Sequence, residues 1–144
     1  MKNREIKFKY LAVKPKIIFS EIFTLKQIEL GEAQKWCEMN LVNRDSLYKL
    51  QFTGLKDKNG KEIYEGDIIK MSLEYHYEHS VYTHSFDGYV FGQVKIIASK
   101  GAVLDKQIMD NHNTGEKYNQ TGYRNISAYR SEIIGNVHEN KDLL

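Results

Sequence analysis

Apolar and polar residues alternate along much of the chain, and a period of two residues is typical of a half-buried β-strand. Residues 5–10 alternate without a break, which predicts a first strand with Ile6, Phe8 and Tyr10 on its buried face. The apolar run at residues 17–23 is short and contains β-branched residues, so it predicts a second strand.

A longer alternation at residues 69–78 predicts one long strand of an antiparallel sheet. Its apolar face carries Ile69, Met71, Leu73, Tyr75 and Tyr77. Asp87 and Gly88 predict a turn, and residues 89–98 then predict the returning strand. The inward residues of that strand are Val90, Val94, Ile96 and Ala98. We also expect a short strand at residues 123–129 and a final strand at residues 132–137.

Two stretches lack the strand pattern. In residues 24–47, an apolar stripe at helical spacing is interrupted by Gly31, which predicts a helical or irregular excursion with a short helix at residues 32–40. The stripe consists of Leu25, Ile28, Ala33, Trp36 and Cys37. Residues 99–121 are rich in Asn, Gly, Asp and Lys, which predicts a long loop with one helical turn around residues 106–109.

The residues around positions 57–60 predict a tight turn between two strands. A two-residue turn would place like charges opposite each other. A type I turn with a glycine bulge instead pairs Asp57 with Lys61 and Lys56 with Glu62. Each cross-strand pair contributes roughly 0.2–1 kcal/mol, so the bulged turn is predicted.

A second tight turn is predicted at residues 65–67. Short strands separated by glycine-containing turns favour a mainly β fold, an antiparallel barrel-like sheet. The excursion at about 24–47 and the loop at about 99–121 interrupt this sheet. The 144 residues predict a single domain over residues 1–144.

The composition indicates the class of protein and the cellular compartment in which it works. The hydrophobic fraction of 41% and the charged fraction of 28% are those of an ordinary globular protein. Cys37 is the only cysteine, so no intramolecular disulfide is possible and a reducing compartment is favoured. The N-terminus has no apolar segment typical of a signal peptide, and every apolar run is shorter than a membrane span. We therefore expect a cytoplasmic protein without a membrane role.

The formal net charge of +2 argues against a strongly basic nucleic-acid binder. Residues 1–18 are nevertheless basic, with Glu5 as the only acid. The basic residues are Lys2, Arg4, Lys7, Lys9, Lys14 and Lys16. A phosphate-binding patch and the solvent face of the first strand are both compatible with this pattern, and we favour the solvent face.

Histidines and carboxylates gather in one segment, where they raise the question of a metal site. This group contains His76, His79, His84, Glu74 and Glu78. Zinc requires three or four converging ligands, and a His-x-x-His spacing on a strand does not make the side chains converge. We interpret the group as a solvated polar face and expect no metal and no cofactor.

Cys37 follows Trp36 in an apolar setting, which is typical of a small buried hydrophobic residue. A reactive thiol requires a basic or helix-terminal partner, and no spacing in the sequence indicates one. No residue is therefore assigned to catalysis.

Aromatic and basic residues together suggest binding to single-stranded nucleic acid, because exposed rings stack on bases. The aromatic residues are Tyr75, Tyr77, Tyr82, Tyr89, Phe91 and Tyr123, and the basic ones are Lys70, Lys95 and Arg124. The alternative is that these rings fill the core or a subunit interface. We favour packing and keep nucleic-acid binding as the second hypothesis.

Three blocks of sequence resemble the YopX protein family of phages and prophages. They are residues 4–8, residues 50–69, and residues 132–140 continuing to Leu143 and Leu144. Two positions depart from the family pattern. Leu11 and Ala12 stand where a Trp-Asp pair is frequent, and the closing block reads Asn-Lys-Asp-Leu-Leu in place of Asn-Pro-Glu-Leu-Leu. These departures concern local packing.

The resemblance implies a β-rich fold, an origin in a mobile genetic element and self-association, but it implies no reaction. We therefore expect a non-enzymatic phage or prophage accessory protein that forms homo-oligomers and contacts a host or phage protein. The alternative is a single-stranded nucleic-acid-binding β-barrel. The apolar pair Leu143 and Leu144 is expected to dock on the body of the protein or on a neighbouring subunit.

Overall fold

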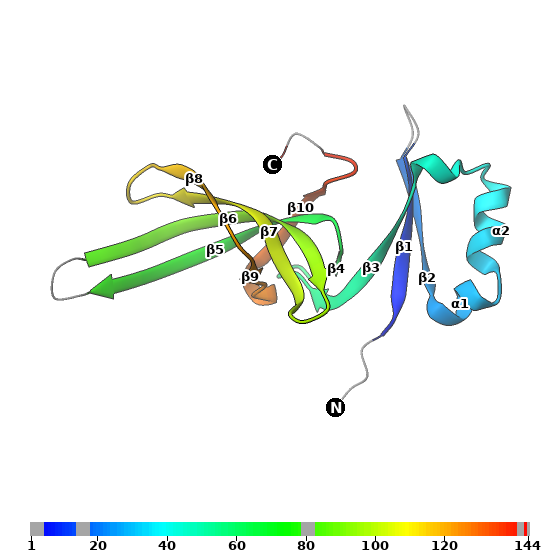
Figure 1. Cartoon of the computed structure of the whole chain (residues 1–144), viewed down its shortest axis with the longest axis horizontal. Coiled ribbons are helices and arrows are strands. Elements are labelled where there is room, and N and C mark those ends of the chain that lie inside the picture. The colour runs from blue at the N-terminus through cyan, green and yellow to red at the C-terminus, as the bar shows by residue number, and fades with distance from the viewer. Residues whose placement is uncertain (1–4, 14–17, 79–82, 141–142, 144) are drawn as a thin grey trace.

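The computed structural model describes residues 5–13, 18–78, 83–140 and 143, with backbone alone at 77–78 and 83–84. Two antiparallel sheets lie along the long axis of the molecule, with the helices at one end (Figure 1). The first sheet has the strand order β2-β1-β3-β4, and the second has the order β10-β5-β6-β7-β8. The mainly β prediction is confirmed, although the described strands form no closed barrel.

The elements of the first sheet and its helices have the following bounds. They are β1 Lys7–Val13, β2 Ile18–Thr24, α1 Leu25–Glu29, α2 Glu32–Met39, the 3₁₀ turn η1 Arg44–Ser46, β3 Leu47–Lys56 and β4 Glu62–Tyr64. Those of the second sheet are β5 Asp67–Glu78, β6 Thr83–Ile97, β7 Gly101–Asn111, β8 Lys117–Gln120, β9 Arg124–Asn125, the 3₁₀ turn η2 Ala128–Arg130 and β10 Ser131–Asn136.

Strand β1 is covered on both faces. Tyr10 packs with Phe23 and Ala33 beneath the helices, and Leu11 packs with a separate cluster that contains Tyr64. The strands predicted near residues 5–10 and 17–23 are confirmed, but the inward position of Ile6 is wrong. Ile6 precedes β1 and is 48% exposed, because the sheet begins only at the next residue.

The predicted excursion contains two short helices. Thr24 caps α1, because its side chain accepts a hydrogen bond from the Gln27 backbone N–H and its own N–H donates to the Gln27 side chain. Gly31, with φ of +80°, separates α1 from α2, and the predicted short helix is confirmed as α2. Trp36 of α2 then packs against Phe19 and Phe23 of β2.

The bulged turn after β3 is confirmed in its register. The Asp57 N–H donates to the Lys61 carbonyl, Lys56 pairs with Glu62, and Gly60 has φ of +81°. The Asp57 carboxylate is 6% exposed and accepts three backbone N–H groups. Their donors and N···O distances are Asn59 at 2.9 Å, Lys61 at 2.9 Å and Ile133 at 3.1 Å. Since Ile133 belongs to β10, this turn of the first sheet is bonded to the second sheet.

The turn predicted at residues 65–67 is also confirmed and joins the sheets a second time. Gly66, with φ of +90°, donates its N–H to the Val94 carbonyl and accepts the Val137 N–H. Asp67 is buried and accepts hydrogen bonds from the Tyr64 N–H and the Asn136 side chain. Burial raises the pKa of Asp67.

The long strand at residues 69–78 is confirmed as part of β5, and Ile69 and Met71 are buried. The turn predicted at Asp87 and Gly88 is wrong, because both residues lie inside β6 and pair with Glu74 and Leu73. A Cβ atom at position 88 would lie 1.9 Å from the carbonyl oxygen of Asp110. The glycine therefore permits the close approach of β7 and does not mark a turn.

Within the returning strand, Val90 and Val94 are buried as predicted. Ile96 is only half-buried, and Ala98 is exposed beyond the end of β6. The pairing with β7 shifts between Phe91 and Gln93, so the simple alternation does not continue along the whole strand.

The long loop predicted at residues 99–121 is wrong, because strands β7 and β8 occupy most of it. The helical turn predicted around residues 106–109 is also wrong, since these residues are part of β7. The buried face of β7 includes the polar residues Gln107 and Asn111, which concealed the alternation. The Gln107 side chain donates to the Gly122 carbonyl and accepts a hydrogen bond from Arg124, which satisfies its polar atoms.

The strand expected at residues 123–129 is reduced to the two-residue β9, whereas the final strand is confirmed as β10. A Cβ atom at Gly135 would lie 2.8 Å from Leu143 Cδ1, so Leu143 lies against the body of the protein while remaining 43% exposed. Leu144 lies outside the described residues.

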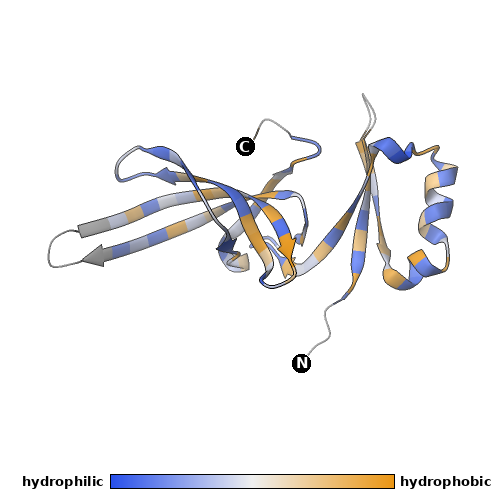
Figure 2. Cartoon of the chain, viewed as in Figure 1, coloured by the Kyte–Doolittle hydropathy of each residue, from blue (hydrophilic) through white to orange (hydrophobic). Residues whose placement is uncertain are grey.

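Each sheet has its own apolar core. The second sheet encloses Ile63, Ile69, Met71, Phe86, Val90, Val94, Leu104 and Met109. Hydrophobic positions are prominent where β6 and β7 run side by side (Figure 2). The first sheet has one cluster around Leu11 and Tyr64 and another around Tyr10 and Phe23. Ile63 and Tyr64 are adjacent in β4 but belong to different cores, so β4 connects the two halves.

We predict that Asp57→Asn lowers the free energy of unfolding by about 2 kcal/mol, because the amide leaves a backbone N–H without its charged acceptor. Burial alone raises the pKa of Asp57, but the three backbone N–H groups outweigh burial and hold it below 3.8. The stabilisation by the wild-type carboxylate is therefore present above pH 3.8 and is lost as the pH falls through the lower folded-state pKa. Urea unfolding at several pH values measures both effects.

Asp105→Asn is the matched control, because Asp105 lies 3.9 Å from the exposed Lys95 in a solvent-screened pair. Its cost should be below about 0.5 kcal/mol. Equal costs for the two variants would contradict the structural role of Asp57.

We predict that Gly88→Ala destabilises the protein by on the order of 3 kcal/mol, because the added methyl group overlaps backbone that has no room to retreat. Gly115→Ala is the control, since position 115 has φ of +74° but open space around its Cβ. That control should lose only about 1–2 kcal/mol through backbone strain. Thermal unfolding followed by circular dichroism compares the two, and a smaller loss at position 88 would contradict the close strand approach.

Candidate functional site

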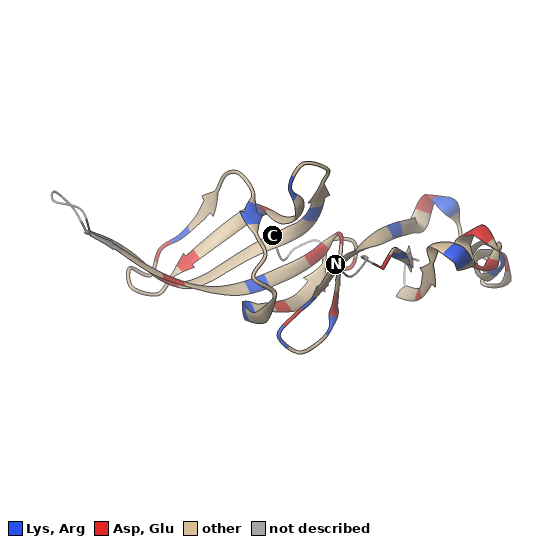
Figure 3. Ribbon diagram, turned by 90° about the horizontal axis from the view of Figure 1, so that it is seen from below, with Lys and Arg blue, Asp and Glu red and all other residues tan. Residues whose placement is uncertain are grey.

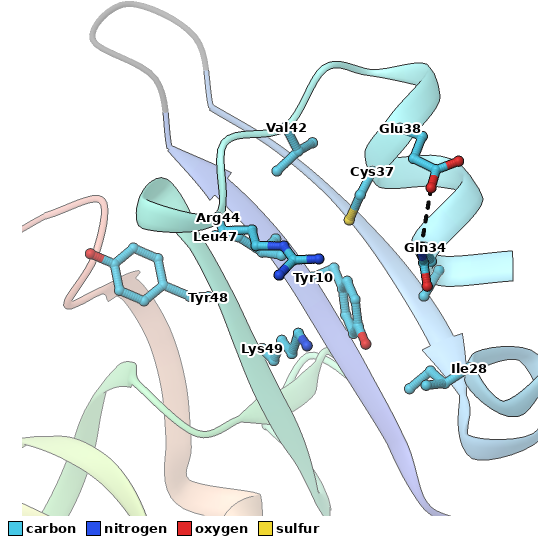
Figure 4. A pocket seen from close by; sticks show the side chains of 11 residues that line it. Tyr10, Ile28, Gln34, Cys37, Glu38, Val42, Arg44, Leu47, Tyr48 and Lys49 are labelled. Carbon is cyan, nitrogen blue, oxygen red and sulfur yellow. Dashed lines mark hydrogen bonds between the residues drawn. The ribbon is translucent and has the colours of Figure 1, made fainter. Parts of the chain in front are cut away.

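A groove of about 750 Å³ lies between α2 and the face of the first sheet (Figure 4). Its walls come from strand β1 and from the continuous stretch that runs from α2 through η1 to the start of β3. They include Tyr10 of β1, Ala33 and Cys37 of α2, Arg44 of η1, and Leu47 and Lys49 at the start of β3. The groove therefore exists only when the helix is packed on the sheet.

The helix side of the groove follows from residue spacing. Ala33 and Cys37 are four residues apart, so they project from the same side of α2. Gln34 and Glu38 are also four residues apart and form a second pair of neighbours on the helix. Ala33 is 2% exposed, and its small side chain lets the helix approach the sheet. The Gln34 side chain donates to the Glu38 carboxylate over 3.3 Å, as the dashed line in Figure 4 shows.

Two weakly acidic groups of the groove, the Cys37 thiol and the Tyr10 hydroxyl, have a raised pKa. Burial raises the pKa of the Cys37 thiol, and the nearby charges of Lys49 and Arg44 offset this only in part. Burial likewise raises the pKa of the Tyr10 hydroxyl. Since the thiolate is the nucleophilic form, Cys37 is a weak nucleophile at neutral pH.

The cations of the groove are not neutralised by carboxylates. Within the part of the chain that the structure describes, neither Arg44 nor Lys49 has an Asp or Glu oxygen within salt-bridge distance. The Lys49 ammonium lies 5.4 Å from the ring centroid of Tyr10, directed at the groove floor. Neither residue stands out in the sequence, because each reaches the groove only when α2 packs on the sheet.

The histidine group is not assembled by the described part of the chain. His76 and Glu74 are exposed on β5, His79 lies outside the described residues, and the side chains of Glu78 and His84 are not described. Among the described residues, no cluster of three or more His, Cys, Asp or Glu side chains is placed to hold a metal ion. The absence of a metal thus stays a prediction.

The candidate aromatic residues are separated by the fold. Tyr75 stacks on Phe86 at 5.7 Å, whereas Tyr123 is 48% exposed on the segment before β9. Tyr77 has no described side chain, and Tyr82 lies outside the described residues. Arg124 is bonded to Gln107, and Lys95 lies near Asp105.

Tyr89, Phe91 and Lys70 do come together on one face of the second sheet. The Lys70 ammonium lies 4.1 Å from the Tyr89 ring centroid, and the rings of Tyr89 and Phe91 are 6.5 Å apart. Tyr129 and Arg130, which the sequence analysis did not consider, add to this surface beside a hollow of about 210 Å³. We call Lys70, Ser72, Tyr89, Tyr129 and Arg130 the lysine–tyrosine surface.

The basic N-terminal residues that are described cover aromatic rings. Lys7 lies 4.7 Å from the Phe52 ring centroid and pairs with Glu62, and Lys9 lies 4.5 Å from that of Tyr64. Lys2, Arg4, Lys14 and Lys16 lie outside the described residues. Basic and acidic positions are interspersed over both sheets in Figure 3. The two described lysines thus lie against rings of the first sheet, and the choice between a phosphate patch and a solvent face stays a prediction.

The fold and its groove define a small β-rich protein in which two linked antiparallel sheets carry a helix pair. The family model described as "YopX protein" matches residues 8–144, a span that includes both sheets and both helices. The chain therefore belongs to the YopX family, and the resemblance of the three sequence blocks is confirmed. No curated protein matches the chain. Among the described residues, no helix has the length and apolar character required to cross a membrane.

Proposed function

We propose that this chain is a non-enzymatic accessory protein of a phage or prophage that works in the bacterial cytoplasm by binding proteins, including copies of itself. The observation that carries the proposal is strand β2, which terminates the first sheet. No described strand pairs with its outer side. An edge strand with exposed apolar side chains is a ready template for pairing with another chain.

The polar–apolar pattern of strand β2 suits antiparallel pairing with the same strand of a second copy of the chain. Ile18 and Ile22 are 48% and 41% exposed and share the sheet face opposite the helices, with the small Ser20 between them. In an antiparallel pair centred on Ser20, Ile18 lies opposite the partner's Ile22. A pair centred on Glu21 would instead oppose two carboxylates, which is unfavourable. The serine-centred register is therefore the one proposed.

The non-enzymatic part of the proposal is supported by the roles of the buried carboxylates. Asp57 and Asp67 bond to backbone N–H groups that hold the turns and sheets together. Cys37 has a raised pKa and so is a weak nucleophile. The two buried carboxylates therefore contribute to folding, and the thiol is poorly suited to covalent catalysis. Binding is the activity that we propose instead.

We predict that the protein forms a homo-oligomer and that Ile22→Lys weakens its self-association at least about tenfold, because two lysines would enter each strand pair. Size-exclusion chromatography with light scattering over a range of concentrations measures the dissociation. Leu30→Lys is the matched control, since Leu30 is 67% exposed between the two helices. A wild-type protein that stays monomeric at high concentration would contradict the proposal.

Single-stranded nucleic-acid binding is the second candidate, favoured by the lysine–tyrosine surface. Arg130 donates to Ser127 through Nη2, while its buried Nε has no hydrogen-bond partner among the described residues. Tyr129 is 77% exposed, and the Arg130 guanidinium carbon lies 5.5 Å from its ring centroid. An exposed ring beside a cation is the arrangement on which single-stranded bases stack. The surface thus combines two cations with two aromatic rings, beside the ion pair that Lys58 and Glu132 form over 3.5 Å.

If this second candidate is correct, a dT oligonucleotide will bind with an affinity that falls steeply with salt, since phosphate contacts release counterions. The double variant Lys70→Gln/Arg130→Gln should then reduce binding about tenfold or more, and Lys100→Gln should have little effect. Fluorescence anisotropy at several salt concentrations decides the matter. Equal binding by both variants would exclude this surface.

A further inference from the structure

We propose that the groove between α2 and β3 binds a small amphipathic organic anion, with an apolar body seated on Tyr10 and its acidic group held by Arg44 and Lys49. This inference does not depend on self-association through β2, because the groove and that strand edge are separate surfaces. The groove is also separate from the lysine–tyrosine surface, since the two share no residue.

The size of the groove suits a small molecule. Its volume of about 750 Å³ lies within the range of roughly 300–1,000 Å³ that is usual for ligand pockets. Helix α2, the turn η1 and strand β3 bound the groove, and Ile28 of α1 closes one end (Figure 4). A compact ligand with an apolar body therefore fits this enclosure better than an extended chain does.

The floor of the groove is apolar and preformed. Tyr10 and Ala33 are buried to 6% and 2% exposure, and Leu47 and Ile28 pack on the same cluster. The floor belongs to the packed cluster beneath α2, and the half-buried side chains of Ile28, Cys37 and Leu47 supply most of its accessible apolar area. An aromatic or branched aliphatic group would lose water contact on this floor, which favours binding.

The charged residues of the groove determine that the ligand is an anion and which way its acidic group points. Arg44 and Lys49 lie on the strand side, and Glu38 lies on the helix side (Figure 4). No described carboxylate pairs with either cation, whereas Glu38 already accepts a hydrogen bond from Gln34. An anion is therefore attracted to the strand side and repelled from the helix side. Arg44 offers paired donors that match a carboxylate, sulfonate or phosphate.

The probe pair 8-anilinonaphthalene-1-sulfonate and N-phenyl-1-naphthylamine tests the proposal, because the second compound has the same apolar body without the charge. We expect one sulfonate probe to bind per chain, measured by fluorescence titration of the folded full-length protein. The double variant Arg44→Gln/Lys49→Gln should weaken its binding about tenfold while changing binding of the neutral probe by less than about twofold. Added salt should weaken the wild-type interaction.

Lys35→Gln is the matched control, since Lys35 is exposed on α2 and does not line the groove. Circular dichroism verifies that each variant remains folded. Cys37 provides a second readout that locates the probe, because it is the only cysteine and lines the groove. Saturating sulfonate probe should slow iodoacetamide alkylation of Cys37 about tenfold in the wild type and in Lys35→Gln.

Three results would overturn the proposal. The first is sulfonate binding that is equal in the wild type and in the double variant. The second is probe binding without protection of Cys37, which would place the probe elsewhere. The third is slowing of Cys37 alkylation by raised protein concentration alone, which would mean that a second copy of the chain covers the groove. A monomeric wild type would leave the ligand proposal intact and would count only against self-association.

Discussion

The two sheets depend on one buried carboxylate at the turn between β3 and β4. Asp57 fixes the turn through Asn59 and Lys61 and reaches Ile133 of β10 with its other oxygen. The apolar cores are separate clusters, and Ile63 of β4 is the buried residue of the first sheet that packs into the core of the second. Hydrogen bonds from the connecting turns therefore supply much of the remaining contact between the sheets. The stacking of Tyr48 on His138, with 3.7 Å between ring centroids, joins the sheets near the Gly66 turn, at the other end of β3. The most recognisable part of the sequence is therefore structural.

Local patterns predicted the elements whose formation depends on neighbouring residues. The register of the bulged turn followed from cross-strand charges around Asp57, and the strands β1 and β5 followed from alternation. The failures involve partners distant in sequence. Gly88 was interpreted as a turn residue, because the sequence does not show that its neighbour in the fold is Asp110. The segment around Gln107 was interpreted as a loop, because a strand with buried polar residues lacks the apolar–polar alternation.

The candidate groove could be predicted only in parts. Cys37 and Trp36 were correctly assigned to an apolar setting, since the sequence stripe is local to α2. The cations Arg44 and Lys49 belong to a different element and reach the groove only after the helix docks on β1 and β3. Both described N-terminal lysines, Lys7 and Lys9, lie over aromatic rings, so a basic residue in the sequence need not leave its charge available to a ligand.

The bond between Asp57 and Ile133 spans 76 positions of the chain. During synthesis, the turn at Asp57 therefore emerges from the ribosome well before β10, the strand to which it is bonded. Until β10 emerges, the outer side of β5 and one oxygen of Asp57 lack their final partners. Long-range closure of this kind slows folding, because a large loop must be ordered before its contacts form. The nascent protein thus passes through a stage in which its first sheet can assemble while its second sheet remains open.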